Sequence, residues 1–202
     1  MNTYYQQAQF LQSATTSKTM PPEFGFEIAF AGRSNSGKSS TINTICHQKS
    51  LARTSKTPGR TQLINFFSLS EGRALVDLPG YGYAKVPERI KKEWAKFIEN
   101  YLTSRRTLCG LVIIMDIRRP MREHDETMLA WAKKRQMPVH VILNKSDKLK
   151  RGAAKNMLLK VRRQLKALDG QFSVQNFSSL KKEGADEVHA VLDQWFFPEG
   201  KN

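Results

Sequence analysis

The sequence is short of acidic residues, because only 18 Asp and Glu stand against 33 Lys and Arg in 202 residues, which gives a formal net charge of +15. A field of that sign attracts polyanions and says nothing about the fold. The imbalance therefore favours nucleic acid or an RNA-rich particle as a partner. A merely solvated basic surface remains the alternative.

Cysteine and long apolar runs are also scarce. The two cysteines, Cys46 and Cys109, fit no metal-ligand spacing and are expected to be buried thiols in a reducing compartment. The longest apolar run, 108–115, is far shorter than the roughly 20 residues that span a bilayer. Residues 1–20 lack the charged-then-apolar pattern of a signal peptide. We therefore expect a cytoplasmic protein with no membrane partner.

Length and composition predict one α/β domain, since 202 residues with 40% hydrophobic side chains bury one substantial core. Residues 1–24 are expected to be a loosely organised N-terminal extension, because Pro21 and Pro22 interrupt any helix there. Residues 25–197 are expected to form the domain, and 198–202 a C-terminal tail.

Hydrophobic periodicity alternates between strand and helix along this domain. The expected strands are 27–31, 62–69, 73–76, 108–115, 139–143 and 172–177. One helix is expected to begin near residue 38, and four more are expected at 90–102, 123–134, 153–168 and 186–196. Strands 62–69 and 73–76 suit an antiparallel hairpin. The pattern predicts a three-layer α/β fold: a mostly parallel sheet with one antiparallel strand and helices on both faces.

A glycine-rich motif follows the first strand of the domain and opens a helix. It reads Gly32, Arg33, Ser34, Asn35, Ser36, Gly37, Lys38, Ser39, and Ser40 follows it. In such a P-loop, successive N–H groups and the helix N-terminus face phosphate oxygens. Lys38 is expected to reach the β- and γ-phosphates and the Ser39 hydroxyl to coordinate Mg²⁺. A plain glycine turn is the alternative, which the preceding strand and following helix weaken.

A second motif, Asp77, Leu78, Pro79 and Gly80, closes the strand 73–76. Its carboxylate can hold Mg²⁺ through a water, and the Gly80 N–H can bond a γ-phosphate oxygen. Alone the motif is weak, because a strand-terminating turn has the same composition. Its position after the P-loop strengthens the prediction that it binds Mg²⁺ and phosphate.

A third motif, Asn144, Lys145, Ser146 and Asp147, follows the strand 139–143. A carboxylate accepts hydrogen bonds from N1–H and the exocyclic amine of guanine, whereas adenine would leave the Asp147 oxygens unpaired. The Lys145 stem can lie over the base, and Asn144 can tie this loop to the P-loop.

A softer segment, Phe177, Ser178 and Ser179, offers N–H groups to the guanine carbonyl, or is an ordinary turn. Ligands of open α/β sheets bind at the carboxyl ends of the strands, where all four segments are expected. The combination predicts a P-loop protein that binds GTP or GDP with Mg²⁺.

With these motifs, the chain resembles the EngB family of the TRAFAC P-loop GTPases over about residues 8–197. The resemblance rests on the motifs at 32–40, 57–62, 77–84 and 144–147. It implies a Ras-like fold, a GTPase acting in assembly of the large ribosomal subunit, and a link to cell division and septation. It also implies nucleotide contacts from Pro58, Gly59, Arg60 and Thr61, with Thr61 as a Mg²⁺ ligand in the GTP state. We expect a monomer.

The expected catalytic residues are Lys38, Asn35, Thr61 and Gly80. Many small GTPases place a water-orienting glutamine directly after the second motif, but this chain has Tyr81, so we expect slow intrinsic hydrolysis. Asn35 resembles the asparagine with which cation-dependent relatives hold K⁺ beside the phosphates. The alternative is that Asn35 contributes only its N–H. Segments 47–61 and 81–86 are expected to move with nucleotide state.

The region between Lys145 and Lys166 holds nine basic residues against one acid, which makes it the strongest candidate for binding ribosomal RNA. Two other functions remain open. An ATPase or small-molecule kinase would share the P-loop but not the motif at 144–147. A non-hydrolysing, nucleotide-sensing RNA scaffold is the second, for which Tyr81 leaves room.

Overall fold

The computed structural model describes residues 2–53, 63–70, 72–81 and 88–199. Its strands are β1 (Gln9–Ala14), β2 (Phe26–Gly32), β3 (Ile64–Ser68), β4 (Arg73–Asp77), β5 (Leu108–Asp116), β6 (Val139–Asn144) and β7 (Phe172–Asn176). Its α-helices are α1 (Lys38–Ile45), α2 (Glu88–Ser104), α3 (Glu123–Lys134), α4 (Arg151–Ala167) and α5 (Ala185–Phe196). Short 3₁₀ helices cover Tyr4–Gln7, Ser17–Thr19 and Ser146–Lys148.

The strands form one sheet in the order β1-β3-β4-β2-β5-β6-β7. From β4 to β7 every neighbouring pair is parallel, while β3 pairs antiparallel with both β4 and β1. Of the described strands, β3 alone runs against the others, which confirms the prediction of a mostly parallel sheet with one antiparallel strand. The predicted hairpin is β3 and β4.

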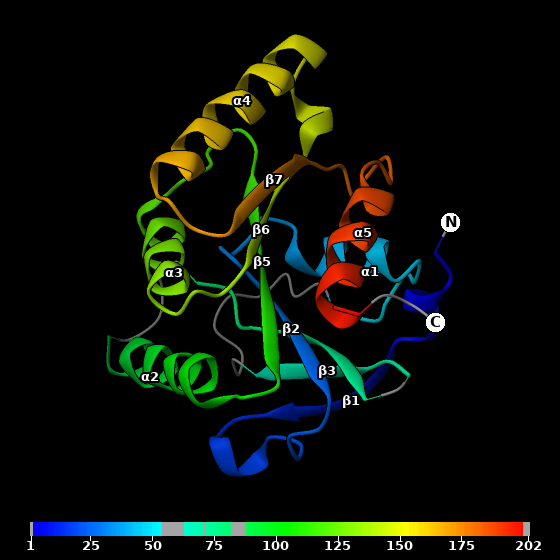
Figure 1. Ribbon diagram of the computed structural model, residues 1–202, viewed down its shortest axis with the longest axis vertical. Helices are drawn as coiled ribbons and strands as arrows, with labels where there is room; N and C mark the ends of the chain where they lie inside the picture. The colour runs from blue at the N-terminus through cyan, green and yellow to red at the C-terminus, as the bar shows by residue number, and fades with distance from the viewer. Residues whose placement is uncertain (1, 54–62, 71, 82–87, 200–202) are drawn as a thin grey trace.

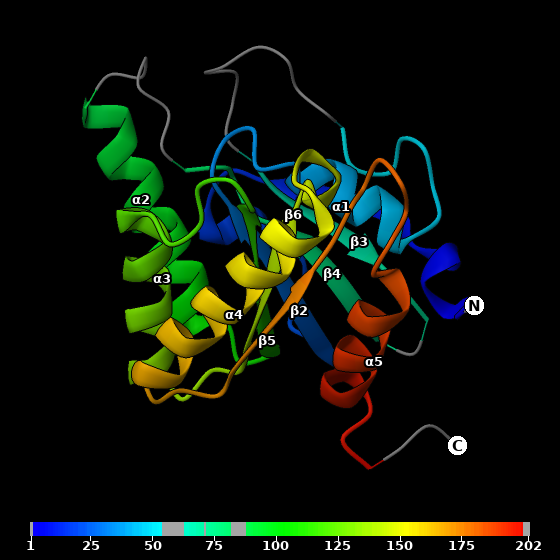
Figure 2. The same cartoon turned by 90° about the horizontal axis from the view of Figure 1, so that it is seen from above.

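Helices cover both faces of this sheet (Figures 1 and 2). On one face, α2, α3 and α4 bury Tyr101, Leu129 and Val161 against the sheet. On the other face, α1 and α5 bury Ile42, Ile45 and Leu192. The central strand β5 is buried on both sides, as its continuous apolar run predicts. The three layers are therefore those of an α/β fold.

The N-terminal region differs from the prediction of a loosely organised extension. Residues of β1 pair with β3 in register, for example Ala14 with Ile64, so the segment extends the sheet. Upstream, Tyr5 is fully buried and its hydroxyl donates a 2.7 Å hydrogen bond to Asp193 on α5. The prediction missed the strand because β1 lies at the sheet edge and half of its residues are exposed. The domain bounds of 25–197 and the tail 198–202 stay a prediction.

A buried ion pair fastens the amino end of β2 to the end of α2. Glu27, 3% exposed, receives two Nε contacts of 3.0 Å and a 2.6 Å bond from the Arg105 guanidinium. The Tyr101 hydroxyl donates to the same carboxylate at 3.0 Å. This arrangement lies at the end of β2 opposite the P-loop.

No helix in the described residues is both long enough and apolar enough to cross a bilayer.

Candidate functional site

The P-loop runs from the end of β2 at Gly32 to Lys38, the first residue of α1. Two residues in it have a left-handed backbone, Asn35 with φ 64° and Gly37 with φ 93°. At Gly37 an added Cβ would collide with Nδ2 of Asn144, so only glycine fits both the backbone angle and the space. The loop therefore brings the start of α1 to the carboxyl end of the sheet.

Lys38 and Asp77 come from different motifs and meet as an ion pair between Nζ and Oδ1. Because β4 pairs with β2, the end of β4 puts Asp77 beside the P-loop. Both side chains are largely buried, 11% and 8% exposed. A phosphate group would compete with Asp77 for the Lys38 ammonium.

The same corner suits Mg²⁺. The Ser39 hydroxyl and the Asp77 carboxylate are hard oxygen donors, and Mg²⁺ in nucleotide sites takes one or two protein ligands together with phosphate oxygens. The described residues contain no group of three or more His, Cys, Asp or Glu that would hold a metal without such a ligand. The donor set therefore fits a metal that arrives with a phosphate chain.

Asn144 joins three predicted segments. Its Nδ2 donates to the Ser36 carbonyl at 3.0 Å, and its Oδ1 accepts from the Ser179 N–H at 3.2 Å and the Ser179 hydroxyl at 3.1 Å. Asn144 is 1% exposed, so these bonds are shielded from water. The side chain thus fixes the P-loop, the loop after β6 and the loop after β7 relative to one another.

Asp147 is fixed by the segment that was only weakly predicted. The Ser178 hydroxyl donates to Oδ1 of Asp147 at 2.6 Å, and Ser178 itself is fully buried. A backbone bond from Ser146 N to Phe177 O at 3.0 Å holds the two loops together. A carboxylate whose position is set in this way is prepared to accept hydrogen bonds from a purine edge.

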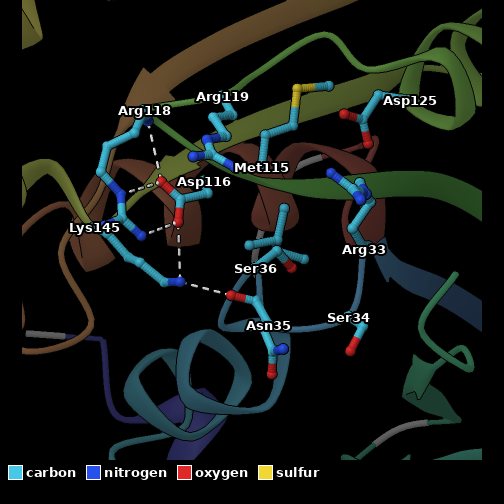
Figure 3. A pocket seen from close by; sticks show the side chains of 11 residues that line it. Arg33, Ser34, Asn35, Ser36, Met115, Asp116, Arg118, Arg119, Asp125 and Lys145 are labelled. Carbon is cyan, nitrogen blue, oxygen red and sulfur yellow. Dashed lines mark hydrogen bonds and ion pairs between the residues drawn. The ribbon is translucent and has the colours of Figure 1, made fainter. Parts of the chain in front are cut away.

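The side chain of Lys145 is held against the P-loop by hydrogen bonds (Figure 3). Its Nζ donates to the Asn35 carbonyl at 2.6 Å and to Oδ2 of Asp116 at 3.0 Å. Arg118 also binds Asp116, through Nε at 2.9 Å and through an amino nitrogen at 2.6 Å. The Arg118 guanidinium, together with the Lys145 ammonium, holds the pKa of the Asp116 carboxyl well below its usual range.

Tyr81, directly after the second motif, is tied to the P-loop and to α3. Its N–H donates to the Gly32 carbonyl at 3.3 Å, and its own carbonyl accepts from Ser34 N at 2.9 Å. Its hydroxyl donates to Asp125 at 2.6 Å. Burial, and then the Asp125 carboxylate, raise the pKa of the Tyr81 phenol well above its usual value.

The structure thus brings the predicted segments of the P-loop, 77–80, 144–147 and 177–179 to one edge of the sheet. Pro58, Gly59, Arg60 and Thr61 lie outside the described residues, so their predicted contacts are unplaced. Sequence reasoning missed Asp116 and Asp125. Asp116 had a signal, because it ends β5 just as Asn144 ends the neighbouring β6. For Asp125, inside the helical pattern of α3, no sequence signal stood out.

Comparison with known proteins agrees with this geometry. The family model described as "50S ribosome-binding GTPase" matches residues 27–145. A second, "Elongation factor Tu GTP binding domain", matches residues 94–198.

Curated relatives are similar over almost the whole chain. "Probable GTP-binding protein EngB" of Enterobacter sp. (strain 638) is 53% identical over 195 residues, covering 96% of this chain and 94% of that protein. The protein of the same name from Coxiella burnetii (strain RSA 493 / Nine Mile phase I) is 54% identical over 192 residues, covering 95% and 94%.

Solved structures share the fold. A crystal structure of a probable GTP-binding protein engB has a TM-score of 0.65 at 17% identity, covering 85% of this chain and 99% of that one. Era in complex with MgGDPNP and nucleotides 1506–1542 of 16S ribosomal RNA has a TM-score of 0.64 at 22% identity, covering 90% and 59%. The family model and the extent of the sequence identity show that the chain belongs to the EngB family of 50S ribosome-binding GTPases.

Proposed function

We propose that the chain binds GTP and GDP with Mg²⁺ at the joined P-loop and 144–147 loop, hydrolyses GTP slowly, and acts as a nucleotide-dependent switch in assembly of the large ribosomal subunit. The observation that carries the proposal is the Asn144 junction, with its 3.0 Å bond to Ser36 and its bonds to Ser179. It joins the proposed phosphate cradle and the loop of the proposed guanine-reading carboxylate in one frame.

The roles of the residues follow from this frame. The P-loop N–H groups and the Lys38 ammonium bind the phosphate chain, with the Ser39 hydroxyl and Asp77 as the protein's Mg²⁺ donors. A bound Mg²⁺ would neutralise charge on the phosphates. Asp147, positioned by Ser178, reads guanine, and the Lys145 stem lies over the base. Thr61 and Gly80 sense the γ-phosphate.

Nucleotide specificity is tested by competition. GTP and GDP are expected to displace a fluorescent GDP analogue, while ATP does not. Asp147→Asn should gain preference for xanthine nucleotides, because an amide NH₂ pairs with the xanthine carbonyl that replaces the guanine amine. Equal competition by ATP and GTP would refute the guanine site and favour an ATPase or a kinase.

Turnover separates the enzyme from a non-hydrolysing scaffold. GTP hydrolysis should be measurable and should disappear in Lys38→Ala. The matched control is Lys134→Ala, because Lys134 is an exposed lysine in the last turn of α3, whereas Asp125, the α3 residue nearest the P-loop side, lies in the first turn. Binding of GTP without any turnover would favour the scaffold instead.

Slow intrinsic hydrolysis is supported by Tyr81, whose hydroxyl is engaged by Asp125 rather than turned to a substrate water. Charge compensation then falls to another group, and we propose that the exposed Asn35 side chain holds K⁺ beside the phosphates. In Figure 3 this amide points away from Lys145, toward which the Asn35 carbonyl is turned. Rates in K⁺ and Na⁺ buffers should differ in wild type and converge in Asn35→Ala; equal wild-type rates would end the potassium proposal.

Binding to ribosomal RNA is supported by α4. The helix carries six basic residues and no acidic one, and all six are exposed: Arg151, Lys155, Lys160, Arg162, Arg163 and Lys166. Such a surface gains affinity by releasing counterions from the phosphate backbone. Binding to large ribosomal subunits should therefore weaken with salt and with charge reversal of Lys160, Arg162 and Arg163. Binding that ignores both changes would refute this footprint.

The cellular role completes the proposal. We place the protein in the cytoplasm as a monomer, where the free thiols of Cys46 and Cys109 stay reduced. Burial raises the pKa of both thiols to about 12, which keeps them unreactive. The proposed link to cell division and septation predicts that depletion accumulates large-subunit precursors before septa fail. Septation defects in cells with normal profiles of ribosomal subunits would show that the role in cell division is independent of the role in subunit assembly.

A further inference from the structure

A cavity of about 460 Å³ lies beside the P-loop (Figure 3). Its described lining comes from the P-loop residues 33–36, the end of β5, the loop at 118–119, the start of α3 and Lys145. Neither Lys38, Ser39 nor Asp147 is among the described lining residues. The described lining therefore overlaps the proposed nucleotide site at the P-loop and Lys145 but leaves out the residues proposed to bind Mg²⁺ and to read guanine.

Cationic side chains predominate in this cavity. Four of them line it, Arg33, Arg118, Arg119 and Lys145, against the two carboxylates Asp116 and Asp125. Asp116 is neutralised by Arg118 and Lys145. The excess charge favours an anionic ligand.

The second carboxylate, Asp125, does not cancel this excess. It is 2% exposed and accepts bonds from the Tyr81 hydroxyl and, at 3.0 Å, from the Arg122 N–H. Within the described parts of the chain, the guanidinium groups of Arg33 and Arg119 make no ion pair with a carboxylate. These two guanidinium groups are therefore available to bind a ligand.

We propose that this cavity binds a phosphodiester group of the RNA of the large ribosomal subunit, an inference that rests on the proposed function. Arginine forks match phosphate oxygens with paired, charge-assisted hydrogen bonds. A space of a few hundred Å³ is that of a small-molecule site, which leaves room for a phosphate with its ribose. Ser36, also in the lining, adds a buried hydroxyl with no hydrogen-bond partner in the described structure.

The positive surface around the cavity suits a phosphate within a polymer better than a free anion. The side chain of Arg118 is 49% exposed, and Arg119 and Arg122 are exposed on the same loop, so the positive surface continues out of the cavity. A phosphate bound here contacts residues 33–36 and Lys145, which also form the nucleotide site. The RNA contact and the nucleotide would therefore share the P-loop and Lys145.

The test is the salt dependence of binding to purified bacterial large ribosomal subunits, with full-length protein and a non-hydrolysable GTP analogue. Arg119→Gln is expected to weaken binding about tenfold at low salt, since it removes one charge-assisted phosphate contact. It should also lower the slope of log K against log salt by about one. Arg119→Lys should keep the slope but bind more weakly, because an ammonium lacks the fork.

Arg106→Gln is the matched control. Arg106 lies at the opposite end of β5, its side chain is 90% exposed, and its only described ion pair is the surface contact with Glu23. The control should behave as wild type. Thermal unfolding of each variant checks that the fold is intact.

Two results would overturn the inference. In the first, Arg119→Gln binds the subunits as tightly as Arg106→Gln, while charge reversal of Lys160, Arg162 and Arg163 on α4 weakens binding. The proposed function would then stand, but the cavity would have no part in RNA binding. Weaker binding of Arg119→Gln with an unchanged salt slope would indicate a protein contact instead of a phosphate. Wild-type protein that fails to bind the subunits at all would refute the proposed function itself.

Discussion

Replacing Asp116 with asparagine removes the charge that orients Lys145, while the volume of the side chain is nearly unchanged. In the structure, one carboxylate serves both neighbours, with Lys145 Nζ at 3.0 Å and the Arg118 fork at 2.6 and 2.9 Å. An amide keeps one acceptor oxygen but presents an NH₂ that repels one of the cations. Lys145 would retain only its 2.6 Å bond to the Asn35 carbonyl.

The magnitude is modest because the pair is partly exposed. Asp116 and Lys145 have side chains that are 20% and 28% exposed, so solvent screens their attraction. An exposed ion pair contributes up to about 1 kcal/mol, and a hydrogen bond to a charged group contributes somewhat more. We therefore expect Asp116→Asn to cost about 1 kcal/mol of GDP binding, which is about a fivefold rise in Kd.

Titration of a fluorescent GDP analogue measures the effect. The control is Arg118→Gln, which removes the outer cation but leaves the Asp116–Lys145 pair, and its Kd should change less than twofold. An unchanged Kd in Asp116→Asn, or an equal loss in Arg118→Gln, would refute the view that Asp116 orients Lys145.

The same carboxylate has a defined pH dependence. Its pKa is lowered in the fold, so the stability that it contributes is fully present above the unfolded pKa of about 3.9 and is lost as the pH falls through the folded value. The difference in unfolding free energy between wild type and Asp116→Asn should therefore be constant from about pH 5 to 8 and shrink below about pH 4. A difference that changes between pH 5 and 8 would contradict this assignment.

Three further outcomes follow from other contacts. Gly37→Ala should weaken GDP binding more than about tenfold while leaving most of the stability, because a Cβ at φ 93° meets Asn144; calorimetry that finds unchanged affinity would contradict it. Glu27→Ala should lower the unfolding free energy by about 3 to 5 kcal/mol in denaturant titration, since it leaves Arg105 buried without its partner. Burial lowers the pKa of His189, so stability should fall as the pH drops below about 6.5, and a His189→Gln variant should show a shallower pH profile in thermal melts.

Sequence alone predicted the inner part of the fold well, because buried parallel strands and amphipathic helices have strong periodic signals. The predicted helix 123–134 matches α3 at both ends, and the expected strand at 139–143 differs from β6 by one residue. Most of the nucleotide motifs could also be predicted, since each lies where a buried strand ends. The carboxyl ends of parallel strands gather at one edge of the sheet.

The edge of the sheet could not be predicted in the same way. In β1, Phe10 and Leu11 are 57% and 49% exposed, so no alternation marks the strand. Its pairing depends on β3, which lies about 50 residues further along the chain. Contacts between side chains of distant elements could not be predicted from the sequence either. The bond of Ser178 to Asp147 requires both loops to be placed first, and the bond of Tyr81 to Asp125 joins the loop after β4 to α3.

Tyr81 shows why a departure from a sequence pattern is informative here. The residue that follows the second motif in many small GTPases orients water, but Tyr81 is bound on both sides: its backbone pairs with Gly32 and Ser34, and its hydroxyl with Asp125. Freeing the phenol would break a 2.6 Å bond to a carboxylate that is 2% exposed, which leaves a buried charge with one donor fewer. These bonds hold the Tyr81 side chain against the P-loop and α3, which supports the proposal that it does not orient the substrate water. Under the proposed function, acceleration of hydrolysis would come from a cation or a partner that reaches the phosphates by another route. The rate in K⁺ and the rate on large ribosomal subunits are therefore the two measurements that test it.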